Sequence, residues 1–155
     1  MKIAIGSDVS GYSLKTALIG HLEEKGIEYK DFGTPNLDSP DEYYDVVPAV
    51  VPLIQSGEYD YGVLLCGTGM GMSQVANSYK GIRAACVESV YAAKMCRAIN
   101  DSNILCMGGF IVAPEMGKEM LDVFLSTQLT EGLDSFHDFL LDAQLQIKDL
   151  EARIY

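Results

Sequence analysis

Short apolar runs alternate with segments of helical length along almost the whole chain, and this alternation limits the fold more than any other feature. Such a series is typical of βαβ units, which build a parallel sheet with helices on both of its faces. Ligands bind such sheets outside the carboxyl ends of the strands, so Asp8, Cys66 and the loop 100–102 are expected to meet at that edge. The pattern predicts strands at 2–7, 27–31, 61–66, 82–87 and 103–107, and helices at 12–25, 45–56, 72–77, 89–98 and 113–126.

Two helical segments need comment. Pro48 and Pro52 fall within 45–56, and a proline inside a helix removes a hydrogen-bond donor, so a kink is expected at Pro52. A last helix over 133–154 follows the finished sheet and carries an apolar stripe, which fits packing on a partner subunit or on its own domain. No linker or repeat divides the chain, and 1–155 reads as one domain. The stripe consists of Phe136, Leu140, Ala143, Ile147, Leu150 and Ile154.

Composition excludes several classes of protein. With 155 residues and 48% hydrophobic content, one domain can bury a full core. A net charge of -11 disfavours nucleic acid, which requires clustered Lys and Arg, and no apolar stretch reaches the roughly 20 residues that span a bilayer. The four cysteines are spaced by tens, without His or Cys at metal-ligand spacing, and the first residues turn polar early. Reduced thiols, a cytoplasmic location and no metal are the expectation.

The stretch Tyr61–Asn77, YGVLLCGTGMGMSQVAN, carries the clearest chemical signal. A buried strand ends there on Cys66, and glycines follow at 67, 69 and 71 before a helix opens. Free backbone N–H groups at a helix start stabilise both a thiolate and the negative charge that develops on a substrate oxygen. A cysteine base beside such a cradle suits proton transfer next to a carbonyl. The plainer alternative, that Cys66 is a small core residue and the glycines form a tight turn, is equally open on this stretch alone.

Five short motifs in order give the chain a family resemblance. The chain resembles the ribose-5-phosphate isomerase B and galactose-6-phosphate isomerase family over nearly its whole length. This resemblance implies a Rossmann-like, three-layer α/β subunit with a five-stranded parallel sheet, and an active site completed across a dimer, often within a tetramer. The motifs are GSD at 6–8, DFGT at 31–34, SGEYDYGVLLCGTGMGMSQVAN at 56–77, KGIRAA at 80–85 and IND at 99–101.

The resemblance also implies a reaction and roles for particular residues. The family interconverts an aldose phosphate and its ketose through a cis-enediolate, without a metal or nucleotide cofactor. Cys66 then looks like the base, Thr68 would orient or protonate the enediolate oxygens, and the N–H groups of 67–73 would hold them. Further substrate contacts are implied for Asp8, Tyr43, Gly67, Gly69, Met70, Gly71, Met72, Ser73 and Asn100.

Five positions depart from the family pattern. Val9 stands where a histidine helps bind the phosphate, and Ile99 stands where a histidine opens the furanose ring. Phe110, Leu133 and His137 correspond to arginines that clamp the phosphate, and only His137 retains a weak, pH-dependent contact. Phe and Leu cannot replace the bidentate contacts of Arg.

These departures predict an aldose–ketose isomerase for a short or unphosphorylated sugar that is mainly open-chain, with Cys66 as base. Three alternatives remain. Arg83, Lys94 or Arg97 could supply the missing charge for ordinary sugar-phosphate isomerase activity. The chain could be a complementary subunit of a hetero-oligomeric isomerase. It could also bind a sugar without turnover.

Overall fold

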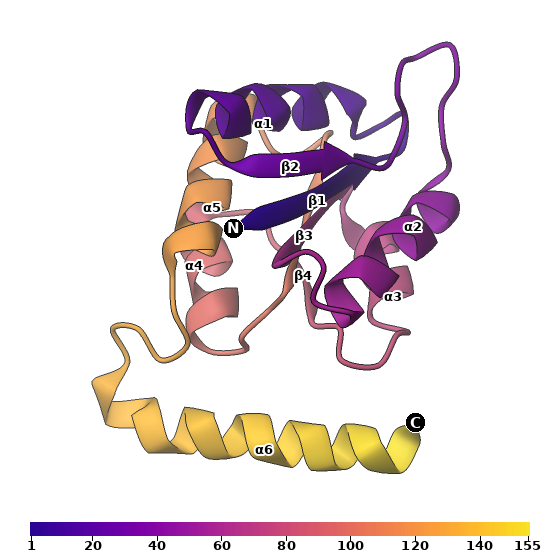
Figure 1. The fold of residues 1–155 in the computed structure, drawn as a ribbon. Helices are drawn as coiled ribbons and strands as arrows, with labels where there is room; N and C mark the ends of the chain where they lie inside the picture. Colours follow the sequence, from indigo (N-terminus) through magenta and orange to yellow (C-terminus); the bar gives the residue numbers. More distant parts are fainter.

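The computed structural model describes residues 1–155 and contains one five-stranded, all-parallel sheet in the order β2-β1-β3-β5-β4 (Figure 1). Strands and helices alternate as the sequence predicts, and the α/β fold is confirmed. The strands are β1 (Lys2–Ser7), β2 (Glu28–Asp31), β3 (Tyr61–Cys66), β4 (Ala84–Cys86) and β5 (Ile104–Gly108). The helices are α1 (Tyr12–Glu24), α2 (Tyr43–Gln55), α3 (Met70–Ala76), α4 (Val90–Ala98), α5 (Pro114–Ser126), a 3₁₀ turn (Asp134–Phe136) and α6 (His137–Ile154).

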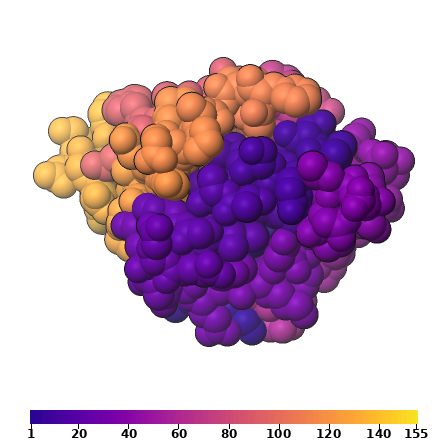
Figure 2. Space-filling view, turned by 90° about the horizontal axis from the view of Figure 1, so that it is seen from above, coloured from indigo at the N-terminus to yellow at the C-terminus, as the bar shows by residue number.

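Helices cover both faces of the sheet, because the inner strands carry apolar side chains on both of their faces. On one face α1, α4 and α5 pack over Ile3, Ile5 and Leu105. On the other face α2 and α3 pack over Ala4 and Leu64. Figure 2 shows α1 and α5 side by side on the surface, where His21 Nε2 lies 2.8 Å from Asp122 Oδ1.

Helix α2 differs from its prediction in two ways. It begins at Tyr43, two residues earlier than predicted, and it continues as a helix through Pro48 and Pro52 to Gln55. Both prolines are exposed, while Val47, Val50 and Val51 are buried. The two prolines, which lack N–H groups, therefore lie on the solvent side of the helix, and its apolar face packs on the sheet.

Helix α6 lies apart from the two covering layers (Figure 1). It runs past the segments that lead into the amino ends of β4 and β5. Leu140 is its one buried residue, and of the predicted stripe Phe136, just before the helix, Leu150 and Ile154 are 51–66% exposed. Most of the predicted apolar stripe is thus uncovered by this chain. None of the helices, α6 included, combines the length and the apolar composition that crossing a membrane requires.

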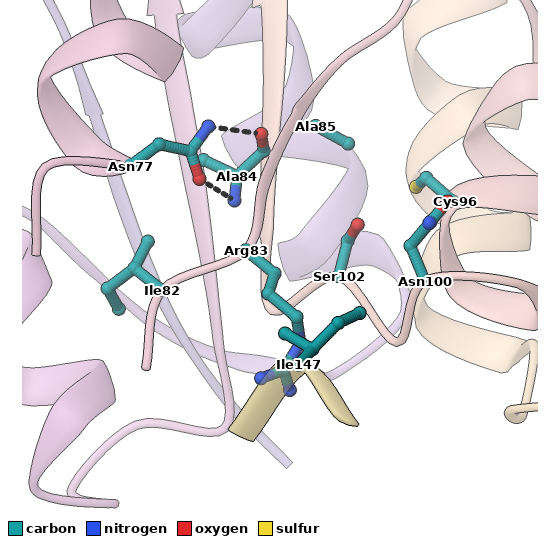
Figure 3. A pocket seen from close by; sticks show the side chains of 9 residues that line it. All are labelled: Asn77, Ile82, Arg83, Ala84, Ala85, Cys96, Asn100, Ser102 and Ile147. Atoms are coloured by element: carbon teal, nitrogen blue, oxygen red, sulfur yellow. Dashed lines mark hydrogen bonds between the residues drawn. The ribbon is translucent and has the colours of Figure 1, made fainter. Parts of the chain in front are cut away.

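The outer edge of β4 is partly closed by a side chain. The Asn77 amide donates to the carbonyl oxygen of Ala84 at 2.8 Å, and its oxygen accepts from the Ala84 N–H at 2.8 Å (Figure 3). Both edge groups of that residue are therefore satisfied without a further strand. The strand is shorter than the predicted 82–87, because only Ala84–Cys86 pair in register with β5.

Candidate active site

Cys66 ends β3 in the middle of the sheet, between the ends of β1 and β5. Its register partner on β5 is Gly108, and Leu65 pairs with Ser7 on β1. The next residue of the β1 segment, Asp8, remains beside β3 because its N–H donates to the Leu65 carbonyl at 3.1 Å. The Asp8 carboxylate in turn accepts the Gly11 N–H at 3.0 Å, which fixes it at the start of α1. Asp8 and Cys66 are thus neighbours at the carboxyl edge of the sheet, as predicted.

The Cys66 side chain faces the glycine loop that opens α3. The N–H of Gly69 points at Sγ from 3.1 Å, in the position that stabilises negative charge on sulfur. Gly69 has φ +78°, and a side chain there would also collide with the Met107 backbone at 2.9 Å. Glycine at 69 is therefore required both for the turn and for the close approach of its N–H to the sulfur.

Not all of the predicted N–H cradle is available to a ligand. Gly69 donates to Cys66 Sγ, Met70 donates to Thr68 Oγ1 at 3.4 Å, and Ser73 donates to the Gly69 carbonyl at 3.1 Å. The loop and first helical turn use these three groups internally. The N–H groups without a protein acceptor are those of Gly67, Thr68, Gly71 and Met72.

The other three cysteines lie in different environments. Cys96 and Cys106 are buried, and burial raises the pKa of both thiols. Cys86, on β4, is partly exposed, and its pKa is raised by burial and then by Glu88. Its S–H donates to the Thr68 carbonyl at 3.5 Å. Cys66 alone among the four lies at the end of a central strand with an N–H directed at its sulfur.

Two aromatic side chains border the loop. The Phe110 ring lies against Gly67, where an added Cβ would be 2.6 Å from Cε2, and the Phe110 N–H donates to the Gly67 carbonyl at 3.0 Å. Tyr43, the first residue of α2, lies along Gly71, with ring atoms 3.2–3.5 Å from an ideal Cβ there. Phe110 is 76% exposed and Val9 is 49% exposed, so the mouth of the site has an apolar border.

The prediction that the 100–102 loop reaches this edge within one chain is wrong. Ile99 and Asn100 follow α4, and the chain enters β5 at Ile104, which pairs with Gly62 at the start of β3. Each helix of a βαβ unit returns the chain to the amino ends of the strands, so this loop lies at the opposite edge from Cys66. The candidates therefore divide into two groups.

We call Asp8, Val9, Tyr43, 66–73 and Phe110 the carboxyl-edge group, and Ile99, Asn100, Leu133 and His137 the amino-edge group. In the second group Ile99 and Leu133 line an apolar cavity of about 210 Å³ with Phe136, Phe139 and Leu140.

Asn100 lines the larger cavity, about 380 Å³, between β4 and α6, and Figure 3 shows Arg83 extending there toward Ile147. His137 is exposed beside Asp138, with 3.0 Å between Nδ1 and Oδ1.

The cations proposed as substitutes for the missing arginines are engaged elsewhere. Arg97 is 4% exposed and donates to Asp101, the Ser102 carbonyl and the Tyr61 hydroxyl. Arg83 also binds Asp101, and Lys94 lies 3.8 Å from Glu131. Within one chain none belongs to the carboxyl-edge group, which contains no Lys or Arg.

Sequence reasoning did not identify the contact between Phe110 and Gly67 or the burial of Lys15, discussed below. A lysine between the buried Leu14 and Leu18 of an apolar helix face was the available signal for Lys15. No three His, Cys, Asp or Glu side chains gather as metal ligands would.

Comparison with known proteins gives consistent matches along the whole chain. The sequence model described as Ribose/Galactose Isomerase matches residues 3–137. A 4-deoxy-4-sulfo-D-erythrose isomerase of Clostridium sp. (strain MSTE9) is 47% identical over 156 residues, covering 100% of this chain and 98% of its own. A D-erythrulose-4-phosphate isomerase of Pectobacterium atrosepticum is 33% identical, covering 85% and 87%. The structure of Clostridium thermocellum ribose-5-phosphate isomerase B superposes with a TM-score of 0.89 at 35% identity, covering both chains fully.

Proposed function

Because this chain belongs to the ribose/galactose isomerase family and is therefore a sugar isomerase, we propose that its substrate is a four-carbon, open-chain aldose ending in a sulfonate. The product would be the corresponding ketose. The observation that carries this proposal is the isoleucine at 99 combined with high identity to a 4-deoxy-4-sulfo-D-erythrose isomerase over the whole chain.

The chemistry of that sugar explains why a ring-opening residue is dispensable. A furanose ring of an aldotetrose needs the hydroxyl at C4, and in 4-deoxy-4-sulfo-D-erythrose a sulfonate replaces it. The sugar stays open-chain, so no group has to open a ring before proton transfer. Ile99, which cannot carry a proton, is compatible with this substrate and unsuited to ribose 5-phosphate.

The terminal group favours sulfonate over phosphate. A sulfonate carries a single negative charge near neutral pH, whereas a phosphate monoester carries close to two. Lys and Arg are absent from the carboxyl-edge group, and Val9 and Phe110 lie at its border. A singly charged, carbon-bound terminus is therefore better matched to this site than a phosphate, whose usual ligands are bidentate arginines. Tetrose 4-phosphates also lack a free C4 hydroxyl, so they are the informative competitors.

We infer that Cys66 acts as the general base. Its thiolate would take the proton from C2 of the aldose, giving a cis-enediolate, and return it to C1 to give the ketose. The free N–H groups of Gly67, Thr68, Gly71 and Met72 would stabilise the charge on O1 and O2, and the Thr68 hydroxyl would move the proton between those oxygens. Asp8 and Tyr43 would bind sugar hydroxyls from the two sides of the loop.

We also propose that the chain works as a dimer or tetramer, in which Asn100 of one copy completes the carboxyl-edge group of another. The separation of the two groups within one chain supports this arrangement, and so do the exposed apolar residues of α6. An isologous contact would then build two equivalent sites per dimer.

The test is isomerisation by the purified chain in heavy water, followed by NMR, with matched substrates. The panel contains 4-deoxy-4-sulfo-D-erythrose, erythrose 4-phosphate, free erythrose and ribose 5-phosphate, and Cys66→Ala is the control. We expect the sulfonate to have the highest kcat/KM and the variant to be inactive. Faster turnover of either phosphate would contradict the sulfonate assignment, and deuterium exchange by Cys66→Ala would exclude the thiol as base.

A further inference from the structure

We propose that Lys15 is a positioning residue for the isomerase reaction, acting on Tyr43 through the turn that follows β2; this inference rests on the proposed function, because Tyr43 matters only if the carboxyl-edge group binds the sugar. Lys15 lies one turn into α1 and is 1% exposed. Neither the sequence motifs nor the proposed mechanism assigns it a role.

The ammonium group of Lys15 has a complete set of partners. It donates to Asp31 Oδ2 at 2.6 Å, to the Gly33 carbonyl at 2.6 Å and to the Thr34 carbonyl at 2.7 Å. Three donors meet three acceptors, so the buried charge is fully satisfied. Two of the three acceptors are backbone carbonyls of consecutive residues, so the ammonium group fixes the course of this backbone as well as pairing with Asp31. The partners of Lys15 point to a positional role.

These partners belong to one turn, 31–34, which lies against the end of β1. A Cβ on Gly33 would be 2.6 Å from the Ser7 carbonyl oxygen and 2.9 Å from Val46 Cγ2. Asp31 adds a further bond within the turn, because its Oδ1 accepts the Gly33 N–H at 3.1 Å. By holding this turn, Lys15 fixes a surface that touches both the residue before Asp8 and helix α2.

The same turn holds the start of α2 through Thr34. The Thr34 hydroxyl, fully buried, accepts the Asp41 N–H at 3.1 Å and lies 3.4 Å from the Asp41 carbonyl oxygen. Two residues later α2 begins with Tyr43, whose ring lies along Gly71 in the first turn of α3. A continuous path of contacts therefore runs from Lys15 through the turn to Tyr43 and the loop that holds Cys66.

The experiment removes the ammonium group without leaving an unpaired carboxylate. In Lys15→Met/Asp31→Asn the charge pair becomes neutral and the side-chain volumes are nearly kept. We expect a folded protein with a lowered unfolding midpoint, because the Gly33 and Thr34 carbonyl oxygens lose their donor. We also expect kcat/KM to fall about tenfold to a hundredfold, since small displacements of a binding group cost this much. Adding Tyr43→Phe should then reduce kcat/KM far less than it does in the wild type, because the tyrosine is already misplaced. Lys25→Met, which removes an exposed lysine at the other end of α1, is the matched control and should behave as wild type.

A readout independent of turnover separates this inference from the proposed function. Amide hydrogen exchange at 41–47 should accelerate in the double variant, while α5 exchanges as in the wild type. If the wild type is inactive on the whole substrate panel, the proposed function fails, whatever the exchange shows. If the wild type is active, a folded double variant with wild-type kcat/KM, or full additivity with Tyr43→Phe, overturns the positioning role.

Thr34→Val decides the case if the double variant does not fold. It removes only the hydroxyl contact with Asp41 and keeps the Lys15 bonds, which go to backbone and Asp31. We expect the same accelerated exchange at 41–47 and the same diminished effect of Tyr43→Phe on kcat/KM. Wild-type exchange and wild-type kcat/KM in this variant would overturn the proposal.

Discussion

The carboxyl-edge group and the amino-edge group differ in how firmly the chain holds them. Around Cys66 the loop is fixed by short backbone bonds and by glycines whose missing side chains leave no free space. At the other edge Ile99, Asn100 and His137 are exposed, and α6 is joined to the body by few hydrogen bonds, among them Gly81 N–H to Glu151 Oε1 at 2.6 Å. The residues proposed for proton transfer thus lie in the firmly held group together with Val9 and Phe110, whereas Ile99, Asn100, Leu133 and His137 could join them only from a second copy, as the proposed dimer requires.

The largest effect should come from removing the base itself. Cys66→Ala is expected to reduce kcat by a factor of about 10² to 10⁴, the usual contribution of a general base. The unfolding midpoint should fall only slightly, because alanine keeps the buried Cβ and only Sγ with its Gly69 N–H contact is lost. Cys86→Ala removes a neighbouring thiol of raised pKa and serves as the matched control. If Cys86→Ala loses as much kcat as Cys66→Ala, the assignment of Cys66 as the base is wrong.

Mixing two inactive variants tests whether the two groups meet across a dimer. Cys66→Ala and Asn100→Ala damage different groups, so a mixed dimer would have one site with both substitutions and one intact site. An equimolar mixture, after dissociation and reassociation, should recover about a quarter of wild-type activity for a two-fold symmetric dimer. Each variant passed alone through the same cycle is the control. No recovery from verified mixed dimers would mean that both groups act in the same chain, or that Asn100 has no role.

Restoring a cation at the carboxyl edge should shift the choice of terminal group. Phe110→Arg places a guanidinium at the border of the loop, and we expect kcat/KM for erythrose 4-phosphate to rise about tenfold relative to the sulfonate, as one charge-assisted contact would give. Phe110→Leu controls for loss of the ring. If kcat/KM for erythrose 4-phosphate relative to the sulfonate is the same in Phe110→Arg and Phe110→Leu, position 110 does not contact the terminal anion.

The smallest effect is expected from restoring only the ring-opening residue. Ile99→His supplies a group able to carry a proton, but Val9, Phe110 and Leu133 still lack phosphate ligands. We therefore expect no measurable gain with ribose 5-phosphate, with Ile99→Leu as the control for disturbance of the apolar cavity. Efficient turnover of ribose 5-phosphate by Ile99→His would show that ring opening alone limits the substrate range.

Hydrophobic periodicity was sufficient to predict a parallel sheet and the alternation of strands and helices along the chain, because the inner strands are buried on both faces and read as continuous apolar runs. It also placed Cys66 at the correct edge. It did not predict the strand order β2-β1-β3-β5-β4. The position of Asn100 was predicted at the wrong edge, although the rule that each helix returns the chain to the amino ends applies to any βαβ unit. Two other features were beyond sequence reasoning. The internal use of the Gly69 and Ser73 N–H groups depends on loop geometry, and the fit of Phe110 over Gly67 depends on packing between segments far apart in sequence.

The amide of Asn77 on the edge of β4 has a consequence for how copies of this chain can join. An open strand edge invites a strand from another molecule, which leads to continuous sheets and to aggregation. Here Asn77 occupies the hydrogen-bonding groups of Ala84, and the opposite edge, β2, is short and carries Glu28, Lys30 and Asp31. Sheet extension is thus disfavoured at both ends. The dimer or tetramer proposed above would then form through side chains of helices, and substitutions at those contacts would leave the sheet that holds Cys66 intact.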